Sequence, residues 1–331
     1  MAVPVWLWIA TIAGLVALLA IDLFIVDRKP HEVTIGEAGR WVTFYVAVAI
    51  AFGLGLWFFS GGVYAGEFFA GYITEYSLSV DNLFIFLIIM TTFKVPAIHQ
   101  HKVLLIGILM ALVMRGIFIA VGAAVIAQFS WVFYLFGVFL IYTGYKLART
   151  DHNQEEEDYQ ENAALRAVRR IFPVTDEYHG AKSFLKVNGK RFATPMFIVI
   201  VAIGTTDLLF ALDSIPAIFG LTKEPFLVFT ANAFALMGLR QLYFLLGGLL
   251  NKLVYLSIGL SVILGFIGVK LILEALHSNS LPFLNDGAPL PVPVIGIELS
   301  LSVIVGVLAI TTVASLIKVK RDAEAEKLPV E

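Results

Sequence analysis

Long apolar runs recur along this chain, and several of them reach the roughly 20 residues that an α-helix needs to cross a bilayer. Of the 331 residues, 59% are hydrophobic and only 15% are charged, whereas soluble domains carry about 25% charged residues. Because no water is available inside a bilayer, every backbone polar group there must be satisfied within the protein, and helices do this for single apolar runs. The sequence therefore predicts an all-α polytopic membrane protein.

About nine transmembrane helices are predicted, with boundaries where proline or charge interrupts the apolar pattern. The run at the N-terminus has no basic residue ahead of it and exceeds the length of a signal-peptide core, so it is predicted to persist as the first helix. The predicted spans are 3–26, 42–60, 66–92, 103–127, 131–147, 194–220, 226–250, 253–275 and 294–317.

These spans divide the chain into four segments. Residues 1–148 hold spans 1–5, 149–193 form a charged cytoplasmic loop, 194–317 hold spans 6–9, and 318–331 form a cytoplasmic tail. The first half of the loop predicts an amphipathic helix, and its acidic run at 155–158 is interpreted as a solvated face. Asn188-Gly189 predicts a small hairpin in the second half.

The distribution of lysine and arginine predicts an N-out, C-in orientation, because cytoplasmic segments of membrane proteins carry an excess of basic residues. In this orientation the outer loops keep only Lys223. The cytoplasmic side then receives Arg28, Lys29, Arg40, Lys94, Lys102, the 149–193 loop, Lys252, Lys318, Lys320, Arg321 and Lys327.

Two parts of the chain repeat the same order of charged residues. Glu75 and Asp81 in the third span match Asp207 and Asp213 in the sixth, 132 residues later; Arg115 and Arg240 match at 125, and Lys146 and Lys270 at 124. Spans 3–5 and 6–8 therefore predict a 3+3 repeat. Because three is an odd number, the second copy enters the membrane from the opposite side, an arrangement typical of secondary transporters. The alternative, a chance alignment of leucine- and glycine-rich helices, does not account for the ordered pairing of charges.

Acidic residues outnumber basic residues within these spans, although a charge at the bilayer centre costs about 2.5 kcal/mol or more. A surplus of carboxylates in a cavity favours a cation pathway over closed ion pairs. The acids in or at the edges of spans are Asp22, Glu67, Glu75, Asp81, Asp207, Asp213, Glu274 and Glu298, and the bases are Arg115, Arg240 and Lys270.

Hard oxygen donors accompany both acid pairs, and such donors suit Mg²⁺, Ca²⁺ or Mn²⁺. The chain has no cysteine, and its six histidines lie in predicted loops or at span boundaries, so a zinc site within the spans is not expected. The predicted metal ligands are Asp81 and Asp213, with Glu75 and Asp207 as extra ligands or proton acceptors and Asn82 and Ser214 as further oxygen donors.

Helix geometry leaves two arrangements open for each acid pair. Six residues turn an ideal helix by about 600°, which places Glu75 and Asp81 about 120° apart. Either one acid faces the site while the other pairs elsewhere, or the helix unwinds between them. Gly204 and Pro216 favour such a break in the sixth span. Arg115 and Arg240 are predicted to have a structural or gating role; as an alternative, they neutralise Asp81 and Asp213 and lock the bundle.

These motifs resemble the TerC/Alx family of bacterial membrane proteins. The resemblance covers roughly residues 40–275 and rests on Tyr72-Ile-Thr-Glu75-Tyr-Ser-Leu-Ser-Val-Asp81-Asn-Leu-Phe, Phe93-Lys-Val-Pro96 with Gln100-His101, Ala111-Leu-Val-Met-Arg115, Thr206-Asp207-Leu-Leu-Phe-Ala-Leu-Asp213-Ser-Ile-Pro216 and Gly238-Leu-Arg240-Gln-Leu-Tyr. It implies export of Mn²⁺ across the bacterial cytoplasmic membrane, within the wider group of LysE-like exporters, and it implies that the acids at 75, 81, 207 and 213 carry transport. Only the resemblance selects Mn²⁺ over Ca²⁺ or Mg²⁺.

The leading functional hypothesis is a secondary transporter that exports Mn²⁺, with proton exchange inferred from the carboxylates. The sequence shows no phosphate-binding loop for ATP, and neither an organic cofactor nor a nucleic-acid partner is expected. An intramembrane enzyme is disfavoured because both motifs lack the Gly-x-Gly-Asp sequence of intramembrane aspartyl proteases. The alternative is a membrane scaffold or assembly factor that docks cytoplasmic or exported protein partners through the 149–193 loop.

Overall fold

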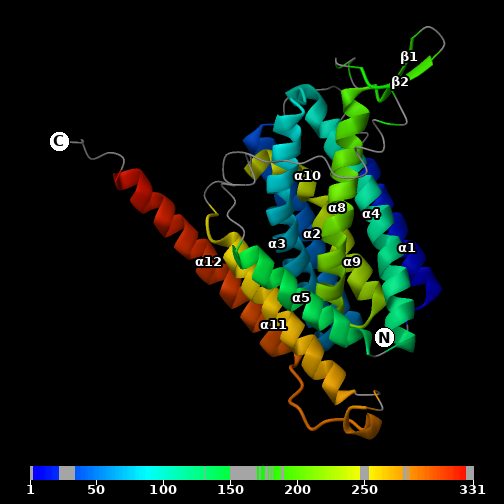
Figure 1. The fold of residues 1–331 in the computed structure, drawn as a ribbon, viewed down its shortest axis with the longest axis vertical. Helices are drawn as coiled ribbons and strands as arrows, with labels where there is room; N and C mark the ends of the chain where they lie inside the picture. The colour runs from blue at the N-terminus through cyan, green and yellow to red at the C-terminus, as the bar shows by residue number, and fades with distance from the viewer. Residues whose placement is uncertain are drawn as a thin grey trace.

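A helix occupies each of the nine predicted span positions in the computed structural model (Figure 1). The structure describes residues 3–21, 34–129, 131–149, 170, 173–175, 178, 180, 182–187, 190–246, 253–278, 281 and 283–325. The helices are α1 (Val5–Ile21), α2 (Ile35–Ser60), α3 (Gly62–Thr92), α4 (Ala97–Gln128), α5 (Val132–Arg149), α8 (Pro195–Phe219), α9 (Pro225–Met237), α10 (Leu239–Leu246), α11 (Leu256–His277) and α12 (Ile297–Ala325). A short 3₁₀ turn, Asn285–Gly287, precedes α12.

Within the described ranges, six helices are long and apolar enough to cross a membrane: α2, α3, α4, α8, α11 and α12. The apolar α1 has 17 residues, and the seventh predicted span consists of two shorter helices. The predicted all-α polytopic membrane protein is therefore confirmed. Pro96, Pro195 and Pro225 lie at helix starts as predicted, because proline lacks the N–H that a first helical turn leaves unused anyway.

The backbone irregularity lies in the seventh span, and the predicted break in the sixth span is wrong. Helix α8 is continuous past Gly204 and through Pro216. Only three helical residues follow Pro216, so the hydrogen bond that proline cannot donate lies near the end of the helix. The seventh span divides at Gly238 into α9 and α10. A methyl group on Gly238 would lie at an ordinary contact distance of 3.7 Å from the ring of Tyr76, so this part of the seventh span lies beside α3.

Three helix pairings build the centre of the bundle. Helix α3 packs on α9, α4 packs on α8, and α5 packs along α11. Helix α3 also contacts α8, so the two predicted halves meet at the centre of the chain's core. Figure 1 shows α12 lying beside α11 and extending away from the other helices toward the C-terminus.

Glycines let α5 and α11 approach until their backbones touch. A methyl group on Gly137 would lie 2.7 Å from the carbonyl oxygen of Gly268, and one on Gly268 would lie 2.7 Å from the carbonyl oxygen of Gly137. A methyl group on Gly144 would lie 2.8 Å from the carbonyl oxygen of Ser261. Small residues at helix crossings are the usual source of close packing in membranes, where burial of apolar surface gives no driving force.

The predicted hairpin is confirmed: β1 (Phe184–Val187) pairs antiparallel with β2 (Lys190–Ala193). It projects beyond the helices beside the start of α8 (Figure 1). The Tyr178 hydroxyl ties this segment to the end of α3 by donating to the Phe93 carbonyl at 2.8 Å. Burial raises the pKa of Tyr178 to about 12, so its hydroxyl stays protonated at neutral pH. The predicted amphipathic helix and the acidic run at 155–158 fall outside the described residues.

Candidate functional site

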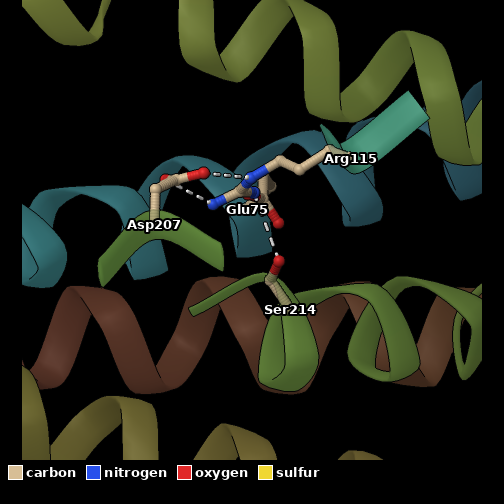
Figure 2. Close-up of polar contacts among 4 residues, drawn as sticks. All are labelled: Glu75, Arg115, Asp207 and Ser214. Atoms are coloured by element: carbon tan, nitrogen blue, oxygen red, sulfur yellow. Dashed lines mark hydrogen bonds and ion pairs between the residues drawn. The ribbon is translucent and has the colours of Figure 1, made fainter. Parts of the chain in front are cut away.

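A buried ion-pair cluster joins three helices at the centre of the bundle (Figure 2). Arg115 on α4 donates from Nε to Asp207 Oδ2 at 3.3 Å and from Nη2 to Asp207 Oδ1 at 3.1 Å. Its Nη1 faces Glu75 Oε1 on α3 as an ion pair and donates to Ser214 Oγ at 3.2 Å. Arg115, Glu75 and Asp207 are at most 2% exposed. The two carboxylates therefore share a single guanidinium.

The helix packing explains why these side chains meet. Both α3 and α4 pack on α8 and on α9, so side chains on their inner faces converge at the same depth. Asp207 and Ser214 are seven residues apart, which is about two helical turns, and therefore share one face of α8. The guanidinium fork binds Asp207 in the two-pronged geometry that lysine cannot reproduce.

The second acid of each motif has a different partner. Asp81, six residues beyond Glu75, accepts a hydrogen bond from Ser257 Oγ on α11 at 2.9 Å. Asp213 accepts one from Thr143 Oγ1 on α5 at 3.3 Å, and Lys146 acts on it electrostatically. Both acids are partly exposed, unlike Glu75 and Asp207. Helix α3 is continuous through its motif, so the first of the two predicted arrangements holds: one acid faces the central cluster and the other pairs elsewhere.

Of the six predicted ligands, the structure brings together Glu75, Asp207 and Ser214. Asn82 is partly exposed on α3, and the joint role predicted for Asp81 and Asp213 stays a prediction. The alternative in which Arg115 neutralises Asp81 is wrong, because Arg115 contacts Glu75 and Asp207 instead. Arg240, its counterpart in the second half, is 1% exposed on α10.

Asn232 and His101 are buried polar residues that the sequence reasoning missed or misplaced. Asn232 on α9 is 1% exposed, and among the described residues its amide has no hydrogen-bond partner. An amide inside an apolar span was the signal that could have found it. His101 was predicted at a boundary, but it is buried within α4 and stacks on Phe244.

The described residues contain no group of three or more acidic or histidine side chains arranged around a common point. Arg115 brings three oxygen-bearing side chains together: Glu75, Asp207 and Ser214. These donors, two carboxylates and a hydroxyl, are of the type that hard divalent cations prefer. In the structure, the Arg115 guanidinium binds both of these carboxylates.

A cavity of about 660 Å³ lies at the end of the bundle where α2 meets α3 and α8 meets α9. Charged side chains line it: Thr222 Oγ1 donates to Glu67 Oε2 at 2.6 Å, and Lys223 Nζ lies 2.5 Å from Glu274 Oε1. The buried Lys270 donates to Ser300 Oγ at 3.2 Å. Glu67 lies on α3 eight residues before Glu75, so this cavity opens about two helical turns from the central cluster.

Comparison with known proteins agrees with the resemblance seen in the motifs. The model of the integral membrane protein TerC family matches residues 60–323. An "uncharacterized membrane protein" of Mycobacterium tuberculosis (strain H37Rv) is 48% identical over 310 residues, covering 93% of this chain and 78% of the relative.

Two further relatives cover nearly the whole chain. An "uncharacterized membrane protein" of Myxococcus xanthus is 42% identical over 326 residues, covering 97% of each chain. The "putative membrane-bound redox modulator Alx" of Escherichia coli K12 is 36% identical over 314 residues, covering 92% of each. No solved structure matches the chain. By the extent of these matches, the chain belongs to the TerC family of integral membrane proteins.

Proposed function

We propose that this protein is a secondary transporter that exports Mn²⁺, or another hard divalent cation, from the cytoplasm. One observation carries the proposal: Glu75 and Asp207, at matching positions of the two halves, meet in the bundle core with almost no exposure. Buried acids within a membrane are costly and mark ion or proton pathways by default. The resemblance to the TerC family supports Mn²⁺ as the ion and export as the direction.

An inverted 3+3 repeat of α3–α5 and α8–α11 is part of this proposal, and the helix contacts support it. A repeat with a two-fold axis in the membrane plane maps the contact of α3 with α9 onto the contact of α8 with α4, and both contacts are present. At the offset of 124, Gly137 corresponds to Ser261 and Gly144 to Gly268. The contact between Gly137 and Gly268 is then the image of the contact between Gly144 and Ser261.

Proton exchange follows from the chemistry of the proposed site. A carboxylate that releases a cation in a buried site is left without its counter-charge, and protonation removes the resulting cost. The partial exposure of Asp81 and Asp213 supports them as the acids that take up and release protons. Thiol–disulfide exchange, one meaning of the redox role in the name of the Escherichia coli relative, is excluded for this chain because it has no cysteine.

The proposed orientation in the cytoplasmic membrane, N-out and C-in, predicts opposite labelling of two lysine positions. The chain lacks cysteine, so Lys223→Cys and Lys186→Cys each carry a single thiol. Both side chains are exposed. A membrane-impermeant maleimide is expected to label Lys223→Cys in right-side-out vesicles and Lys186→Cys in inverted vesicles. The reverse pattern would contradict the orientation.

Mn²⁺ flux into inverted vesicles tests the transport function directly. Wild type is expected to accumulate Mn²⁺. Asp81→Asn and Asp213→Asn are expected to slow uptake at least about tenfold, because replacing a residue that only supports the metal ligands already lowers metal affinity or activity about 10–100-fold. Collapsing the pH gradient is expected to slow the wild type if protons are exchanged. Glu298→Gln, an exposed acid at the start of α12, is the matched control and should transport normally.

The scaffold alternative predicts a different outcome in the same vesicles. If wild type moves no Mn²⁺, transport fails as the function and the scaffold alternative is favoured. If both asparagine variants move Mn²⁺ as fast as wild type, Asp81 and Asp213 are structural and the ion pathway does not use them. A scaffold acting through the 149–193 loop would lose its function on deletion of the loop, whereas a transporter that keeps both acid pairs would still move ions.

A further inference from the structure

We propose that Arg115 is a tethered competitor for the transported cation. In the state described here its guanidinium occupies the site formed by Glu75 and Asp207, and a divalent cation binds these carboxylates only when the guanidinium withdraws. The inference rests on the proposed function, since it assigns to Arg115 the control of that same site. It also gives a reason for an arginine, rather than an apolar residue, in the core of a membrane protein.

The contacts of Arg115 cover both carboxylates that an ion would need. All three guanidinium nitrogens are engaged: Nε and Nη2 with the two oxygens of Asp207, and Nη1 with Glu75 and Ser214. Both oxygens of Asp207 are therefore taken. Because the cluster holds two carboxylates and one guanidinium, it retains one surplus negative charge when both acids are ionised. A divalent cation in place of the guanidinium would neutralise both carboxylates.

Two buried side chains with oxygen atoms, one on α3 and one on α9, make no hydrogen bond to any described residue while Arg115 is bound. Thr74 and Asn232 are at most 1% exposed, and among the described residues their side chains make no hydrogen bond. Native structures rarely leave such groups unsatisfied, and each case requires an explanation. A cluster built only to hold Arg115 gives these groups no purpose, whereas an ion with several oxygen ligands does.

The register of α9 against α3 places Asn232 alongside the α3 segment that carries Thr74 and Glu75. A methyl group on Gly71 would lie 3.3 Å from the Ala231 side chain, and one on Gly238 would lie 3.7 Å from the Tyr76 ring. Residues 231–238 therefore run alongside residues 71–76, the segment that includes Thr74 and Glu75. Asn232 comes from α9, which packs on both α3 and α4.

A tethered competitor weakens the apparent affinity for the ion by a calculable factor. When only a fraction of the protein is competent to bind, the apparent dissociation constant equals the intrinsic constant divided by that fraction. Minor conformations of proteins are commonly populated at about 0.1–10%. Removing the competitor is therefore expected to lower the apparent Kd for Mn²⁺ at least about tenfold.

The first test measures equilibrium Mn²⁺ binding to the full-length protein in detergent, by the loss of the free Mn²⁺ paramagnetic resonance signal. Arg115→Gln is expected to bind Mn²⁺ at least about tenfold more tightly than wild type, with slower flux because the ion is no longer displaced from the site. Arg115→Lys keeps the positive charge but loses the fork, so its affinity is expected to lie between the two. Equal or weaker binding by a folded Arg115→Gln overturns the inference.

Ser214→Ala supplies a test in which every side-chain charge is kept. Ser214 holds Nη1 of Arg115, so its removal loosens the competitor and is expected to tighten Mn²⁺ binding several-fold. If Ser214 is instead an ion ligand, as the sequence predicted, the same change weakens binding. The sign of the change therefore decides, including in the case where Arg115→Gln does not fold.

Failure of the inference and failure of the proposed function give different results. If wild type neither binds nor moves Mn²⁺ and the variants do not bind it, both the proposed function and the inference are wrong. If wild type moves Mn²⁺ while Arg115→Gln and Ser214→Ala bind it no more tightly, transport stands and Arg115 is a structural tie between the helices.

Discussion

Asparagine in place of Asp207 is expected to lower the free energy of unfolding by about 3–5 kcal/mol, the usual cost of removing one partner from a buried ion pair. The change removes the charge that receives two donors of Arg115 and points an amide N–H₂ at a group that can only donate. Arg115 is 1% exposed, so water cannot replace the lost carboxylate without a rearrangement. Unfolding by sodium dodecyl sulfate in mixed micelles measures the change.

A double-mutant cycle separates this pair from general effects of substitution. Arg115→Gln combined with Asp207→Asn is expected to cost less than the sum of the two single changes, because no buried charge of this pair is then left unpaired. Asp213→Asn is the matched control: Asp213 is partly exposed, so the substitution should cost less than Asp207→Asn. Additive single effects would show that the pair of Arg115 and Asp207 contributes nothing specific to stability.

Alanine in place of Gly268 is expected to force α5 and α11 apart. The new methyl group would lie 2.7 Å from the carbonyl oxygen of Gly137 and 2.8 Å from the side chain of Ile141. A backbone oxygen cannot rotate away as a side chain can, so relief requires a shift of one helix. Overpacking of this kind typically costs about 1–3 kcal/mol, measured by the same unfolding titration.

Gly265→Ala on the same helix is the control, because a methyl group there would meet open space. Its stability is expected to match the wild type or exceed it slightly, since alanine is the better helix former. The two helices also hold the outer acids: α11 supplies Ser257 to Asp81, and α5 supplies Thr143 to Asp213. Gly268→Ala is therefore expected to slow Mn²⁺ flux as well. A variant as stable and active as wild type would show that this contact is not tight.

Features that depend on local sequence were predictable from the chain alone. Apolar length gives the helices, because a bilayer leaves a single apolar run no other way to satisfy its backbone. Proline at the first position gives the starts of α8 and α9. Asn188-Gly189 gives the hairpin, because these residues tolerate the positive φ angles of a two-residue turn. The acidic and basic residues of the core were also identified, since charge within an apolar run stands out.

The partners of those charges could not be predicted, because they depend on how each helix is rotated and at what depth it packs. The matching of Arg115 to Asp81 failed for this reason: the two halves align in sequence, but Arg115 reaches Glu75 and Asp207 instead. The unwinding predicted at Pro216 failed, since α8 continues through Pro216 and only three helical residues follow it. The division of the seventh span at Gly238 was not predicted, and the residues that the structure describes give no local reason for it.

The sequence by itself determined a polytopic helical membrane protein of the TerC type, with acids at matched positions of two halves. These conclusions follow from hydrophobic length, charge and order along the chain, all of which are local or one-dimensional. Only the tertiary structure decided that Glu75, Asp207 and Ser214 surround one guanidinium while Asp81 and Asp213 turn to α11 and α5. Two side chains six residues apart on a helix point about 120° apart. The packing of the neighbouring helices therefore selects which acid of each pair faces the central cluster.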